Sequence, residues 1–146
     1  MSLSAPDAAD RVEQLIVLTE RLAERLSDET LAFEARRPHE VAKGSPETQR
    51  LANLYRHESA RIRGNPALIA GAAKERREAL RQVTVTFEAV LARHGRALGA
   101  AKTITEGLVR AIAEEITAQR AGAAGYGPTA KAPAANGSAI ALNRRA

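Results

Sequence analysis

Several residue types are scarce or missing in this sequence of 146 residues. It has no cysteine and no tryptophan, and only two phenylalanines and two tyrosines. The missing cysteines exclude a disulfide framework and a cysteine-ligated metal site. Leu, Ile, Val and Phe together make up only about a fifth of the chain, so a thick aromatic core is also excluded.

Long apolar runs are missing as well. The longest strongly apolar run, residues 15–18, is far shorter than the roughly 20 residues that span a bilayer. Residues 1–10 carry two aspartates, no basic residue and no apolar stretch, unlike a secretory signal. We therefore expect no membrane insertion and a cytoplasmic protein, which the lack of cysteine also fits.

The residues that dominate are alanine, glutamate, arginine and leucine, with 32 alanines alone. This composition is typical of long helices in a thin bundle or coiled coil. Thin helical layers leave few deep pockets, so we expect no enzyme.

The net charge of +5 is unevenly distributed. Residues 7–35 are acidic, whereas every later segment carries a basic surplus. The simplest use of this pattern is pairing within the chain. Acids are interleaved with the bases and aromatic residues are nearly absent, so we expect no nucleic-acid partner.

Periodic apolar residues predict two helices in the first half of the chain. Spacings of three and four residues favour a helix over about 7–35, and Pro38 ends it. Residues 39–44 are expected to form a loop. Ser45 then acts as an N-cap before a second helix over 46–63, which Gly64 terminates.

A third helix is predicted over 66–121, where the same spacing continues without an internal proline. The β-branched residues 83–86 are assigned to this helix because the period runs through them. A bend near Gly71 or Gly95 is expected. Residues 122–146, rich in glycine and proline, are expected to form a flexible tail.

The predicted fold class is therefore all-α, an elongated antiparallel helical bundle or coiled coil with one long C-terminal helix. Residues 1–121 form the bundle and residues 122–146 the flexible C-terminal tail. No histidine has a partner at metal-ligand spacing, and neighbouring carboxylates such as Glu114 and Glu115 point about 100° apart on a helix. We predict no catalytic, cofactor-binding or metal site.

One cluster of large apolar residues falls near the end of the long helix. It is either ordinary bundle core or a surface that receives an amphipathic segment of another protein. Gly95 and Gly99 likewise indicate either close approach of a helix within the bundle or of a partner helix. The candidate client-binding residues are Leu98, Ile104, Leu108, Val109, Ile112 and Ile116.

The tail contains the sequence Tyr126-Gly127-Pro128 and ends with apolar and then basic residues, 140–145. A helical bundle of this length with such a tail resembles the FlgN family of flagellar type III export chaperones, although Ala130 replaces a glycine of that family's tail pattern. The resemblance implies a cytoplasmic chaperone of bacterial flagellum biogenesis, without catalysis or cofactors. It would bind helical termini of hook-associated proteins, as a monomer or small oligomer.

The same resemblance assigns Tyr126 and Gly127 to binding of the flagellar export gate. On the residues alone, an isolated aromatic side chain in such a tail is either a linker residue or an anchor for another protein. A second hypothesis for the whole chain is a self-associating coiled-coil scaffold protein.

Overall fold

The computed structural model describes residues 2–125, with side chains described up to residue 122. The chain divides into a first unit, Met1–Lys102, and a second unit, Thr103–Ala146. Five helices and no strand occur among the described residues. The predicted all-α class is confirmed.

Helix α1, Ala8–Glu34, agrees with the predicted bounds to within one residue at each end. Asp7 is its N-cap, and the Asp7 carboxylate accepts a hydrogen bond of 2.8 Å from the Asp10 amide. Beyond the helix, Arg36 adopts a φ of 59°, and this left-handed backbone redirects the chain before Pro38.

The loop predicted over 39–44 is wrong, because His39–Ala42 forms a short helix, α2. Pro38 precedes it with φ −62°, an angle that the proline ring sets and that helix requires. The amides of Glu40 and Val41 then donate to the carbonyls of Arg37 and Pro38, so the turn is satisfied locally.

Helix α3, Ser45–Gly64, begins one residue before the prediction and ends one residue after it. Ser45 is not the N-cap; that position belongs to Gly44, which makes no side-chain cap. The Thr48 hydroxyl donates to the Gly44 carbonyl at 3.2 Å instead. The C-cap is Asn65, so Gly64 marks the end as expected.

The single helix predicted over 66–121 is wrong at its start, and it ends at Gly125, four residues later than predicted and inside the segment predicted as tail. The structure has a short helix α4, Ala67–Ala70, and a separate helix α5, Lys74–Gly125. The break lies beside the predicted bend at Gly71, and Ala72 packs there against Val12 and Ile16. Helix α5 is continuous through residues 83–86 and through Gly95, so the helical assignment of 83–86 is confirmed.

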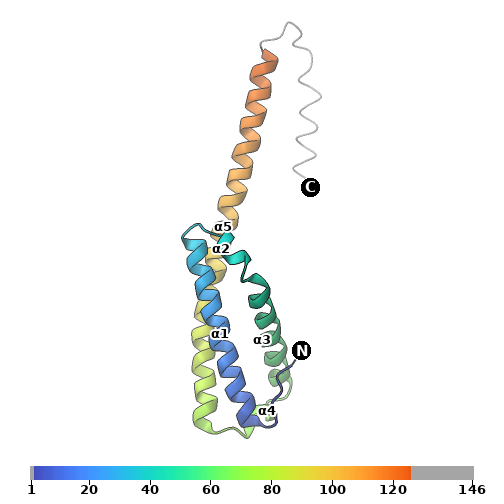
Figure 1. Cartoon of the computed structure of the whole chain (residues 1–146), viewed down its shortest axis with the longest axis vertical. Coiled ribbons are helices and arrows are strands. Elements are labelled where there is room, and N and C mark those ends of the chain that lie inside the picture. The colour runs from blue at the N-terminus through green and yellow to red at the C-terminus, as the bar shows by residue number, and fades with distance from the viewer. Residues whose placement is uncertain (1, 126–146) are drawn as a thin grey trace. The chain divides into compact units, whose positions relative to one another are not determined.

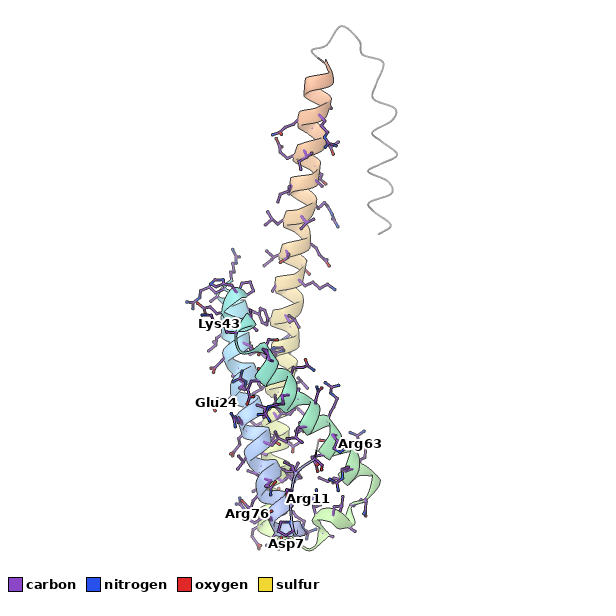
Figure 2. All side chains as sticks on the ribbon, turned by 45° about the vertical axis from the view of Figure 1, so that its right-hand side comes forward. Asp7, Arg11, Glu24, Lys43, Arg63 and Arg76 are labelled. Carbon is purple, nitrogen blue, oxygen red and sulfur yellow. The ribbon has the colours of Figure 1, made fainter. Side chains whose placement is uncertain are left out.

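The helices of the first unit run up, down and up (Figure 1). Ion pairs define the directions: Arg11 and Arg21 of α1 meet Glu58 and Glu47 of α3, so these helices are antiparallel. Glu13 and Glu34 of α1 meet Arg76 and Arg93 of α5, so α1 and the first part of α5 are parallel. In Figure 2, Arg76 lies beside the end of α1 where Asp7 is found. Lys43 lies at the opposite end of the bundle.

Two apolar clusters form the core of the first unit, one in the middle of the bundle and one beside the break before α5. Tyr55 packs against Phe87 with ring centroids 4.8 Å apart and ring planes tilted by 55°. The buried members are Leu18, Leu22, Leu26, Leu51 and Phe87 in the middle, and Val12, Ile16 and Ala72 at the break.

A buried carboxylate completes this core. Glu58 is fully buried, and its carboxylate accepts hydrogen bonds from Arg11 at 3.0 Å, from Arg61 at 3.2 Å and from the Leu3 amide at 2.9 Å. Glu58 thus connects α3 to α1 through Arg11, and to the N-terminal segment through the Leu3 amide. No helix among residues 2–125 is long and apolar enough to cross a membrane.

Candidate binding surface

The large apolar side chains of the second unit lie on the surface of α5. We call Ile104, Leu108, Val109, Ile112 and Ile116 the apolar face; each is between 46% and 62% exposed. The sixth candidate, Leu98, belongs to the first unit and is also exposed. None of the six contributes to the buried core of the described chain.

Helix geometry places the members of the apolar face together. Residues 104, 108, 112 and 116 recur at intervals of four and therefore follow one another along one side of a helix. Val109 lies next to this row. Every residue from 103 to 122 is exposed, and side chains leave this part of α5 in all directions (Figure 2). Large exposed apolar groups gathered on one face are typical of an interaction site.

One charged residue lies on the edge of this face. Glu115 follows Leu108 by seven residues and Ile112 by three, spacings that keep side chains on the same side of a helix. The Gln119 amide donates to the Glu115 carboxylate at 3.4 Å. The apolar face therefore carries a negative charge near its C-terminal end.

The two glycines of the Gly95-x-x-x-Gly99 pattern do not mark a close helix contact. A methyl group built at either position would meet nothing within 4 Å. The expectation that another helix of the bundle approaches there is wrong for the described chain. The buried side of α5 in the first unit is formed by other residues, such as Phe87 and Ala97.

Sequence reasoning missed a groove between α1 and α3 in the first unit. It measures about 390 Å³, and Leu3 and the exposed side chain of Val17 are among its lining residues. The Leu3 amide is held by Glu58 and the Ser4 carbonyl by Gln14. No signal in residues 2–6 could have placed them there, because the Leu3–Glu58 contact joins residues 55 positions apart.

A histidine–carboxylate pair between α1 and α5 was also missed. His94 Nε2 lies 3.0 Å from Glu29 Oε2, both side chains are 14% exposed, and Phe33 packs edge-on against the imidazole ring. Within residues 2–122, no group of three or more acidic or histidine side chains is arranged to hold a metal ion. The candidates Tyr126 and Gly127 lie outside the residues that the structure describes.

Comparison with known proteins supplies the biological context for this surface. The chain is 50% identical, over 149 aligned positions that span 100% of both proteins, to the flagellar basal-body protein FlbY of Caulobacter vibrioides. The chain belongs to the FlbY family. No family model matches the chain, and no solved structure matches it.

Proposed function

We propose that this FlbY-family protein is a cytoplasmic flagellar export chaperone. It binds helical termini of hook-associated proteins and delivers them to the type III export gate, without catalysis. The observation that carries this proposal is the apolar face, five large side chains exposed on one side of a helix. The flagellar name of the relative and the FlgN-like tail support it.

The apolar face suits an amphipathic helix as its client. Such a helix presents apolar residues at intervals of three and four, and these pack between the side chains at 104, 108, 112 and 116. The described helices leave the face exposed, so binding requires none of the buried core to open. A client terminus that is unfolded when free would become helical as it binds, because its contacts with the apolar face stabilise the helix.

Binding of hook-associated termini tests the proposal directly. Synthetic terminal peptides are titrated into the full chain by calorimetry, and the variant L108S/I112S is compared with V85S/L91S. The control pair lies on α5 in the first unit, and Val85 and Leu91 are similarly exposed. The proposal predicts at least a tenfold loss of affinity for L108S/I112S alone; equal affinities for both variants would refute it.

Self-association is the competing function, because the same exposed row at helical spacing could pair with a second copy. Sedimentation of the free chain over a hundredfold concentration range distinguishes the two. A self-associating scaffold gives an average mass that rises with protein concentration, and L108S/I112S abolishes this rise. Such a scaffold does not bind the terminal peptides.

The tail has a separate role in this proposal. Tyr126 and Gly127 bind the export gate, because an aromatic ring buries much area at little cost in rotamer freedom. Tyr126→Ala should leave client affinity unchanged and weaken gate binding by about 2 kcal/mol, a typical hot-spot loss. Loss of client binding to the same extent would instead place the ring on the client surface.

A further inference from the structure

The apolar face lies within reach of the chain's own C-terminus. Helix α5 ends at Gly125, and Ile112 precedes that residue by 13 positions. At 1.5 Å per residue, the two are about 20 Å apart along the helix axis. Leu108 and Ile116 lie one turn to either side of Ile112.

The sequence beyond Gly125 contains one short aliphatic segment. Ile140 and Leu142 are the large aliphatic residues of 126–146, and Ile140 follows Gly125 by 15 positions. A flexible linker of 15 residues has a root-mean-square span of about 21 Å. This span matches the 20 Å to Ile112, the condition under which a tethered segment reaches its highest effective concentration.

The charges of the two segments are complementary. Residues 126–146 carry Lys131, Arg144 and Arg145 and no acid. Residues 103–125 carry three acids and two bases, with no base in the last turn of α5. The partial negative charge at that helix end and the Glu115 carboxylate on the apolar face both favour a basic segment.

A second copy of the chain fits the face less well. Parallel pairing in register would set Glu115 against Glu115 of the other copy, and such like-charge contacts are costly. A second copy also lacks the advantage of the tether, which supplies an effective concentration in the millimolar range for short flexible linkers.

We propose that residues 140–145 dock within the same molecule onto Leu108, Ile112 and Ile116. Ile140 and Leu142 cover apolar surface, and Arg144 and Arg145 lie near Glu115. This docking would compete with an incoming client helix, a consequence that rests on the proposed function. The tail would then regulate the surface that the client uses.

A spin label on the tail tests the docking without any client. The chain has no cysteine, so Ser138→Cys provides a single attachment point in the full-length protein. Line broadening of the backbone amides of residues 104–122 is measured by NMR in three backgrounds: the otherwise unchanged chain, I140S/L142S, and the matched tail control A139S/A141S.

The proposal predicts strong broadening centred on residues 108–116 in the unchanged chain and in A139S/A141S, and at least a threefold weaker effect in I140S/L142S. Equal broadening in all three backgrounds would overturn it. A mixture of spin-labelled, NMR-silent chain with unlabelled, isotope-enriched chain detects docking between molecules. Broadening of the enriched chain as strong as in the single-molecule sample would also overturn the proposal, in favour of a second copy.

Client titration separates this inference from the proposed function. If docking occupies the face, I140S/L142S should bind a hook-associated peptide about two- to tenfold more tightly, because more chains are competent to bind, whereas A139S/A141S should not change. If the spin label detects docking but no variant binds the client peptide, the chaperone function is refuted and the docking is upheld. If the spin label detects strong docking in the unchanged chain but I140S/L142S binds the client with unchanged affinity, the tail does not compete with the client.

Discussion

The assignment of core and surface along the chain can be tested by two truncations of aliphatic residues, Leu22→Ala and Ile112→Ser. Leu22 is 1% exposed at the centre of the first unit. Its truncation removes buried methyl groups and leaves a cavity, which costs about 2–5 kcal/mol of the free energy of unfolding.

Ile112 is 52% exposed, so at most about half of the roughly 1.5–3 kcal/mol for full burial of such a side chain is at risk. Isoleucine and serine have similar helix propensities, so the change of residue adds little. The expected loss for Ile112→Ser is therefore below about 1.5 kcal/mol.

Urea unfolding followed by far-UV circular dichroism gives both values, since stability falls linearly with denaturant. Unfolding is also monitored through tyrosine fluorescence, because Tyr55 packs against Phe87 in the first unit. A loss of about 2 kcal/mol or more for Ile112→Ser in the I140S/L142S background, which removes the proposed tail docking, would show that other parts of the chain bury the side chain in solution. The account of an open apolar face would then be wrong.

Three further predictions concern the first unit. Glu58→Gln should cost about 3–5 kcal/mol because it leaves the buried Arg11 without its counter-charge, measured by the same urea titration; a cost below 1 kcal/mol would refute burial of the pair. Hydrogen bonds from Arg76 hold the pKa of Glu13 below its usual value, so this pair stabilises the fold above the unfolded pKa, and the stabilisation is lost as pH falls through the lower folded pKa. Glu13→Gln should therefore reduce the decline in stability on acidification below pH 5, and an unchanged pH profile would contradict this. Gly95→Ala should raise stability by up to about 1 kcal/mol, since nothing lies within 4 Å of the added methyl group and alanine favours helix; destabilisation in thermal melts would reveal a close helix contact there.

The parts of the fold that sequence reasoning predicted well are those set by local chemistry. The first helix was placed within one residue at each end because an apolar period and Pro38 both act over a few residues. The break between α4 and α5 was predicted only as a bend, because the helical period continues through it. Packing of Ala72 against Val12 and Ile16, distant in sequence, accompanies the break.

The same distinction applies to the candidate site. Spacing alone identified the residues of the apolar face, but spacing is identical for a covered and an uncovered helix side. Their exposure depends on what packs against α5, which is a tertiary property. The burial of Glu58 likewise depends on a tertiary contact, because its partner Arg11 lies 47 residues earlier and has no local signal.

Hydrogen exchange of the full chain with and without a bound hook-associated terminus tests the central claim most directly. Residues 103–122 are exposed throughout, so their amides should exchange faster than those of α1 in the free chain. Client binding to the apolar face should slow exchange at residues 104–116 and leave the α1–α3 groove unchanged. Protection confined to that groove, or no protection anywhere in α5 at saturating client, would contradict the account.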